Sequence, residues 1–119
     1  MAKHNETGVK GEQIAVNYLL NIGYKILCRN WRHGRKEVDC IALKDNTVIF
    51  VEIKTRRSFD FGFPEEAVHP VKKKHLKLAA EAFMNRHMQY DTLRFDIISV
   101  VLAADDGVKE LLHIEDAFY

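Results

Sequence analysis

Three charged residues stand inside an apolar stretch of this chain, where a buried strand would not favour them. Asp39 lies within the segment VDCIAL, and Glu52 and Lys54 lie at the end of the segment TVIFVEIK. An ionised group in an apolar strand costs free energy unless it is paired or binds a metal. The pattern D…E-x-K therefore indicates a metal-dependent site or a structural ion network, and the residues alone leave both readings open.

The metal-dependent reading has a definite chemistry. Carboxylates on adjacent strands, here Asp39 and Glu52, can hold Mg²⁺ or Mn²⁺, and the backbone carbonyl of Ile53 can add a third oxygen. A metal held in this way lowers the pKa of a bound water and neutralises charge on a phosphodiester. Lys54 shares a strand face with Glu52 and would orient the water or stabilise the phosphate. The chemistry expected is phosphodiester hydrolysis.

A helix predicted over residues 8–22 brings one more carboxylate. It begins after a cap at Asn5 or Thr7 and ends at Gly23. Glu12 lies on the border of its apolar face, where it would complete the metal shell or bind its waters. The alternative is an acid favoured by the helix dipole. The apolar face consists of Ile14, Ala15, Tyr18, Leu19 and Ile22.

The other elements follow from hydrophobic periodicity and turn residues. Strands are predicted over residues 24–31, 37–43, 47–54, 93–103 and 109–114, a helix over 71–89, and a basic loop over 32–36. The segment VIFVEI is apolar on both faces, which is typical of a central strand. A crossover helix can place the fourth strand parallel to the third. We predict one domain over residues 1–119, an α/β sandwich of the three-layer type with a central mixed sheet flanked by helices.

Net charge is +1, but its distribution is uneven. Residues 103–119 carry −4, which leaves +5 on the rest of the chain. The candidates for phosphate contacts are Arg32, Arg56 and Lys72, although ordinary solvated faces would give the same pattern. Lys72 lies one turn before Leu76 on the inward stripe of its helix, so it either points toward the carboxylates or snorkels to solvent.

Several features bear less directly on the chemistry. Cys28 and Cys40 match no zinc spacing and are expected to be reduced and buried. Residues 59–63 carry alternating phenylalanines, Phe59, Phe61 and Phe63, that cover the core or form a flap. Arg94 and Asp96 form an ion pair or contact a ligand. No apolar run reaches about 18 residues and the N-terminus is no signal peptide, so no membrane association and a cytoplasmic location are expected.

Six short motifs together resemble the small bacterial YraN-like family, which is similar to archaeal Holliday-junction resolvases of the PD-(D/E)XK nuclease superfamily. Lys36 replaces a glycine common in the family. The resemblance implies a restriction-endonuclease-like fold with Glu12, Asp39, Glu52 and Lys54 at the active-site positions. The motifs are G-E-x-x-A-x-x-Y-L (11–19), G-Y-x-I-L (23–27), N-W-R (30–32), E-V-D-x-I-A (37–42), V-x-F-V-E-I-K-T-R (48–56) and R-F-D (94–96).

The resulting hypothesis is a Mg²⁺- or Mn²⁺-dependent endonuclease that hydrolyses DNA, with branched DNA as a candidate substrate. A homodimer would fit, because resolvases act as symmetric pairs on a two-fold junction. The alternatives are a non-catalytic nucleic-acid-binding or scaffold module on the same fold, and a structural domain with a buried ion network.

Overall fold

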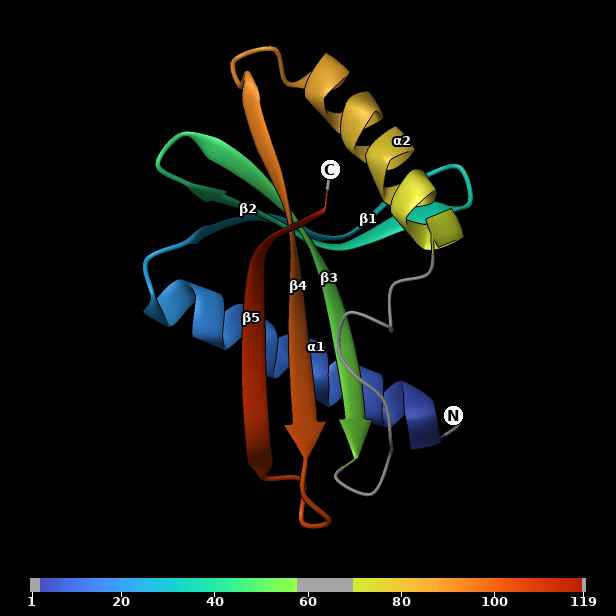
Figure 1. Ribbon diagram of the computed structural model, residues 1–119, viewed down its shortest axis with the longest axis vertical. Helices are drawn as coiled ribbons and strands as arrows, with labels where there is room; N and C mark the ends of the chain where they lie inside the picture. Colours follow the sequence, from blue (N-terminus) through green and yellow to red (C-terminus); the bar gives the residue numbers. More distant parts are fainter. Residues whose placement is uncertain (1–2, 58–69, 119) are drawn as a thin grey trace.

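The computed structural model describes residues 3–57 and 70–118, with side chains from residue 6. The order within these ranges is helix, three strands, helix and two strands, as the sequence predicts (Figure 1). The elements are α1 (Lys3–Asn21), β1 (Lys25–His33), β2 (Lys36–Lys44), β3 (Thr47–Arg57), α2 (Pro70–Arg86), β4 (Thr92–Leu102) and β5 (Val108–Phe118).

The strands form a single mixed sheet in the order β1-β2-β3-β4-β5. Neighbours are antiparallel except for β3 and β4, which run parallel from Thr47↔Thr92 to Arg57↔Leu102. The parallel pairing confirms the predicted crossover, and β3 is central as its apolar residues indicate. The carboxyl end of β3, with its charged residues, stays paired with β4 as far as Arg57, beyond the last residue that pairs with β2.

The two helices cover opposite faces of the sheet, and Figure 1 shows α1 crossing behind β3, β4 and β5. Alternation along β3 gives each helix its own apolar row. Ile49 and Val51 pack with Leu19 of α1, whereas Phe50 packs with Phe83 of α2. Burying such side chains stabilises the fold by about 1.5–3 kcal/mol each. The structure thus has the α/β sandwich architecture that was predicted.

Turn chemistry sets the register of the central hairpin. The sequence Lys44-Asp45-Asn46 predicts a turn between the second and third strands. The structure has this turn at Asp45 and Asn46, with φ of 49° and 64°. Positive φ at both central residues matches the right-handed twist of the flanking strands. The pairing then runs from Lys44↔Thr47 to Cys40↔Val51.

The prediction of a basic loop over residues 32–36 was wrong. Arg32 lies within β1 and Lys36 is the first residue of β2, so only Gly34 and Arg35 connect the two strands. Gly34 adopts a φ of 63°, which a glycine reaches without steric cost and which permits so tight a turn. Both strands are therefore longer than predicted and form an extended hairpin.

Other boundaries also differ. Helix α1 begins at Lys3, five residues before the predicted start, and α2 ends at Arg86, three residues early. The ring of His87 bonds the Phe83 carbonyl at 2.8 Å, which satisfies an otherwise unpaired group at the end of α2. The last strand, predicted over 109–114, continues to Phe118 because it stays paired with β4 as far as Phe95↔Phe118.

The cysteines are both free, as expected, although Cys28 is half-buried and only Cys40 is buried. The segment with Phe59, Phe61 and Phe63 lies outside the described residues. Among the helices within residues 3–57 and 70–118, none is long and apolar enough to span a membrane.

Candidate metal centre

Glu52 is a buried carboxylate near the carboxyl end of the central strand, with 3% of its surface exposed. It follows Val48 and Phe50 on the face of β3 that α2 covers. Alternation along the strand therefore directs it into the protein and not into solvent. Because it is buried directly after the apolar Val48 and Phe50 of this row, the carboxylate lies where ionisation is costly.

Asp39 lies where β2 separates from β3. The last pair of these strands is Cys40↔Val51, and Asp39, the residue next to Cys40, lies beyond this pairing. In place of a backbone carbonyl, Asp39 Oδ2 accepts a hydrogen bond of 2.8 Å from the Ile53 N–H. Ile53 is the residue next to Glu52, so this hydrogen bond holds the Asp39 carboxylate close to Glu52. The predicted pair is thus brought together, and not divided between the two faces of the sheet.

The proximity of the two carboxyl groups changes the acidity of Glu52. The pKa of Glu52 is raised to about 8, chiefly by burial and further by the charge of Asp39 and a hydrogen bond with the Asp39 carboxyl group. The positive charges of Lys72 and Lys54 oppose it. Like charges close together in a poorly solvated place produce this effect. A cation bound between them would remove it.

One oxygen of this pair is left without a hydrogen bond. Glu52 Oε2 is buried and has no hydrogen-bond partner among the residues that the structure describes. Lys72 Nζ lies 3.6 Å from it, close enough for an ion pair but too far for a hydrogen bond. Buried polar atoms are nearly always satisfied, so an orphaned carboxylate oxygen needs an explanation. It provides an available ligand atom, and carboxylate oxygens suit Mg²⁺ and Mn²⁺.

Lys54 and Glu12 approach the pair from two elements. Lys54 follows Glu52 by two residues in β3, and its charge acts on that carboxyl group. Glu12 is half-buried in α1, and burial raises its pKa, with a further rise from the charge of Asp39. Glu12 therefore joins the group through Asp39. The use of the Ile53 carbonyl as a ligand stays a prediction.

A close helix–strand contact positions Glu12. Gly11 is buried in α1, and a Cβ built there would lie 1.7 Å from Thr55 Oγ1 of β3. No side chain fits in that space, so glycine lets α1 approach the sheet at this point. Glu12 is the next residue, and the approach carries it toward Asp39. The sequence motif contained Gly11, but its spacing gave no sign of this contact.

The three predicted phosphate contacts have different surroundings. Lys72 does point toward the carboxylates, because its Nζ lies 3.6 Å from Glu52 Oε2. Arg32 is highly exposed and pairs with Glu37 at 3.0 Å. Arg56 follows in β3 and is half-buried. Of the three, only Lys72 is shown next to the carboxylate pair.

The predicted Arg94–Asp96 ion pair is confirmed, with Nε to Oδ1 at 2.8 Å. The sequence did not predict the wider group around this pair. His113 Nε2 lies 2.7 Å from Asp96 Oδ2, and Arg94 also contacts Tyr24 and Glu115. No local pattern predicts that these distant residues meet. Asp96, His113 and Glu115 have ligand atoms within 4.8 Å of one another, but hydrogen bonds already occupy both oxygens of Asp96.

Fold and site together define an α/β protein in which the half-buried Asp39 and the buried Glu52 lie close together on neighbouring strands of a mixed sheet. The chain belongs to the uncharacterised protein family UPF0102, whose model matches residues 11–100. This is the YraN-like family that the motifs predict. A UPF0102 protein of Bacteroides thetaiotaomicron is 45% identical over 119 residues, covering 100% of this chain and 97% of its own. A UPF0102 protein of Caldicellulosiruptor saccharolyticus is 44% identical over 114 residues, which are 95% of this chain and 97% of that protein.

Proposed function

We propose that this protein is a metal-dependent endonuclease that hydrolyses DNA phosphodiesters. One observation carries the proposal: the buried Glu52 carboxylate lies beside Asp39, and its Oε2 has no hydrogen-bond partner in the part of the chain that the structure describes. A structural ion network would be expected to satisfy its own buried atoms. A site that binds a divalent cation would instead leave ligand atoms free in the empty protein.

Each residue has a definite role in this proposal. Asp39 and Glu52 hold Mg²⁺ or Mn²⁺, and the Ile53 N–H keeps the Asp39 carboxylate in place. The metal, when bound, supplies an activated water and neutralises charge on the phosphate. Lys54 orients the attacking water or stabilises the charge that develops on the phosphate. Glu12 binds waters of the metal through its position beside Asp39, and Lys72 contacts a substrate phosphate.

The resemblance to the PD-(D/E)XK superfamily supports this assignment. There a helix acid, a strand aspartate and an E-x-K strand form the site, and Glu12, Asp39, Glu52 and Lys54 stand at those positions. The likeness to Holliday-junction resolvases favours branched DNA as the substrate. A homodimer would match the two-fold symmetry of a four-way junction.

Cleavage assays test the proposal directly. A synthetic four-way junction, a flap and a linear duplex are incubated with the protein in Mg²⁺ or Mn²⁺. We expect metal-dependent cutting that falls at least about 100-fold in Asp39→Asn and in Lys54→Ala. Asp45→Asn is the matched control, because Asp45 lies in an exposed turn whose positive φ asparagine adopts readily.

Calorimetric titration with Mn²⁺ gives a readout independent of cutting. Binding that is lost in Glu52→Gln and kept in Asp45→Asn supports the metal centre. DNA binding without cutting by the wild-type protein would instead support a non-catalytic module. If neither DNA nor metal binds, the carboxylates belong to a structural network and the proposal is wrong.

A further inference from the structure

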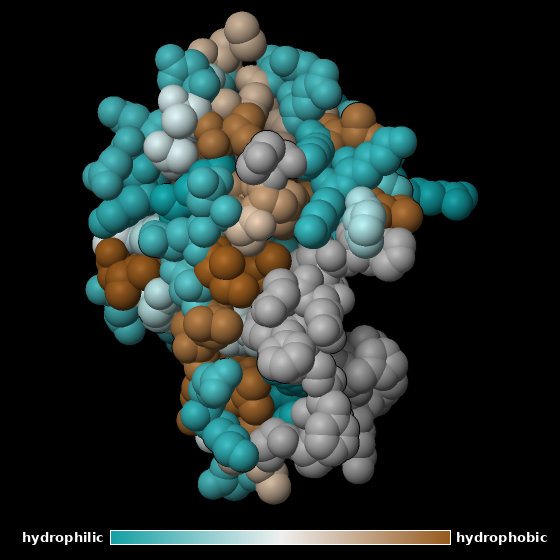
Figure 2. All heavy atoms as spheres, in the orientation of Figure 1, coloured by the Kyte–Doolittle hydropathy of each residue, from teal (hydrophilic) through white to brown (hydrophobic). Residues whose placement is uncertain are grey.

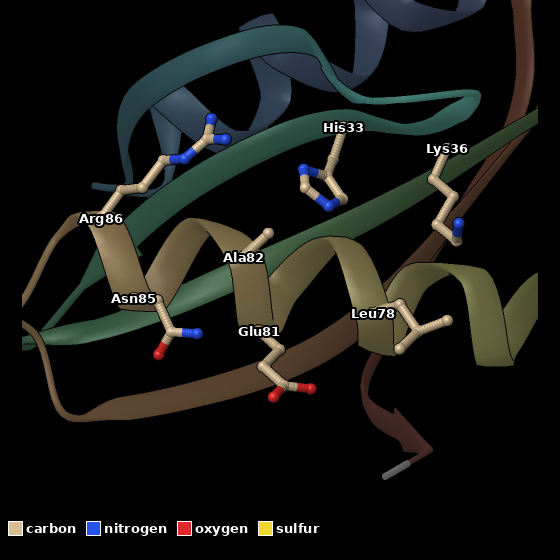
Figure 3. A pocket seen from close by; sticks show the side chains of 7 residues that line it. All are labelled: His33, Lys36, Leu78, Glu81, Ala82, Asn85 and Arg86. Carbon is tan, nitrogen blue, oxygen red and sulfur yellow. The ribbon is translucent and has the colours of Figure 1, made fainter.

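A groove lies between the β1–β2 hairpin and one side of α2, and neither Asp39 nor Glu52 lines it. It has a volume of about 450 Å³, within the range of cavities that take small organic groups. Figure 3 shows His33 and Lys36 reaching from the hairpin side above α2, with Ala82 facing them. The lining residues are His33, Lys36, Leu78, Glu81, Ala82, Asn85 and Arg86.

The floor of one end of this groove is a stack of planar groups. The ring of His33 lies parallel to that of Trp31, at 6° and with centroids 6.2 Å apart. The Arg86 guanidinium lies 6.0 Å from the centre of the same indole. Trp31 is held in turn by an edge contact with Phe83, at 5.5 Å, in the core beneath α2. His33 is therefore a ring on a rigid support, suited to stacking with another flat group.

The charges of the groove favour an anion. Lys36 and Arg86 provide two fixed positive charges against the single negative charge of Glu81. Figure 2 shows that the surface over α2 is mostly hydrophilic, which does not favour an apolar partner. Flat stacking groups beside phosphate-binding cations are the combination that proteins use for single-stranded nucleic acid.

The groove also leads toward the carboxylates. Lys36 precedes Asp39 by three residues in β2, about 10 Å along a strand. On the other wall, α2 runs from Lys72, beside Glu52, to Arg86, about 21 Å along its axis. An extended nucleic-acid strand bound in the groove would therefore run between the hairpin and α2 toward the proposed metal centre.

We propose that this groove binds a single nucleic-acid strand, with phosphates on Lys36 and Arg86 and a base stacked on His33. The choice of nucleic acid as ligand rests on the proposed function. A groove of about 450 Å³ has room for a nucleotide of an unpaired strand, whose exposed base can reach the His33 ring, whereas the bases of a duplex are stacked on one another. The groove would hold an unpaired strand of a branched or frayed substrate while the adjoining phosphodiester reaches the carboxylates.

Fluorescence anisotropy with a labelled oligothymidylate of about 12 nucleotides, in a chelator, tests this without cutting. We expect His33→Ala to weaken binding about fivefold or more, and His33→Phe to restore it. Arg86→Ala should weaken binding and reduce the slope of log affinity against log salt by about 0.7. Lys25→Ala is the control, since it removes one exposed positive charge at the opposite end of β1 and should change affinity little.

An oligonucleotide with abasic positions separates stacking from charge. It should bind the wild type more weakly, and His33→Ala should then add almost nothing, because both changes remove the same contact. Unfolding midpoints of all variants are measured alongside, so that weak binding of an unfolded protein is not counted. The proposal is overturned if folded His33→Ala and Arg86→Ala bind like Lys25→Ala, or if a duplex competes better than the single strand.

The outcome is distinguishable from failure of the proposed function. If single-strand binding depends on His33 and Arg86 but no metal-dependent cutting occurs, the groove proposal is supported and the nuclease proposal is refuted. If cutting depends on Asp39 and Lys54 but not on the groove residues, the nuclease proposal is supported and the groove proposal is refuted.

Discussion

Two buried carboxylates on neighbouring parallel strands have opposite surroundings. Asp96 in β4 is fully buried and accepts hydrogen bonds from Arg94, from His113 and from the Asp116 N–H. Glu52 in β3 is 3% exposed, and its Oε2 accepts no hydrogen bond within residues 3–57 and 70–118. Both carboxylates are buried, but Asp96 is surrounded by donors whereas Glu52 lies beside a second carboxylate.

Their pKa values follow the supply of donors. Burial opposes ionisation of Asp96, but hydrogen bonds from His113 and Arg94 outweigh it and leave the pKa of Asp96 below its ordinary value. Burial also opposes ionisation of Glu52, and the neighbouring Asp39 adds to the effect, so that the pKa of Glu52 rises to about 8. The Asp96 carboxylate has its donors within the protein, whereas the Glu52 carboxylate lacks them. A bound cation, as proposed above, would supply the missing partner of Glu52.

Asp96→Asn should have the largest effect on stability. It leaves the Arg94 guanidinium and His113 without their carboxylate, and breaking a buried charge pair costs about 3–5 kcal/mol. Urea unfolding at neutral pH measures the change, with Asp45→Asn as the matched aspartate control. A loss below about 1 kcal/mol would mean that the network around Asp96 contributes little.

Gly11→Ala should follow, with a loss near the upper end of the 1–3 kcal/mol that overpacking costs. The added Cβ overlaps Thr55 Oγ1, so α1 must move away from β3 and carry Glu12 with it. Gly8→Ala is the control within the same helix, because nothing lies within 4 Å of a Cβ there. That change should stabilise α1 by about 0.5–1 kcal/mol. Equal effects of the two substitutions would contradict the close contact.

Glu52→Gln should have the opposite sign to Asp96→Asn. The amide carries no charge and can donate a hydrogen bond to Asp39, so we expect a gain of about 1–2 kcal/mol at pH 8 in a chelator. The gain should disappear near pH 4.5, where the wild-type Glu52 is protonated in the native state. Thermal and urea unfolding at both pH values measure it. A destabilised Glu52→Gln at pH 8 would refute the contrast between the two carboxylates.

The dependence of wild-type stability on pH gives the most gradual effect. Between about pH 4.5 and 8 the unfolded chain has released the Glu52 proton and the native protein still holds it. Stability in a chelator should therefore fall as pH rises through this window, by at most about 1.4 kcal/mol per pH unit. This slope should be absent from Glu52→Gln. Asp96 acts the other way, and its contribution is lost as pH falls below 3.8.

The fold was largely predictable because it depends on local signals. The apolar segment VIFVEI predicted a central strand, the Asp45-Asn46 turn predicted the hairpin, and the intervening helix predicted the parallel crossover. The ends of elements were less predictable, because pairing with a neighbour decides where a strand stops. Strand β5 extends to Phe118 along β4 although its own sequence indicated an end at Ile114.

The candidate site was predictable in its residue types but not in its environment. The sequence by itself determined that Asp39, Glu52 and Lys54 lie on adjacent strands and that Glu12 borders a helix face. Only the tertiary structure decided which buried carboxylate is satisfied. Asp96 receives its donors partly from His113 and Asp116 in another strand, and Asp39 uses the Ile53 N–H freed where β2 leaves β3. Hydrogen bonds between segments far apart in the chain have no local pattern, so the orphaned oxygen of Glu52 becomes visible only when the sheet is assembled.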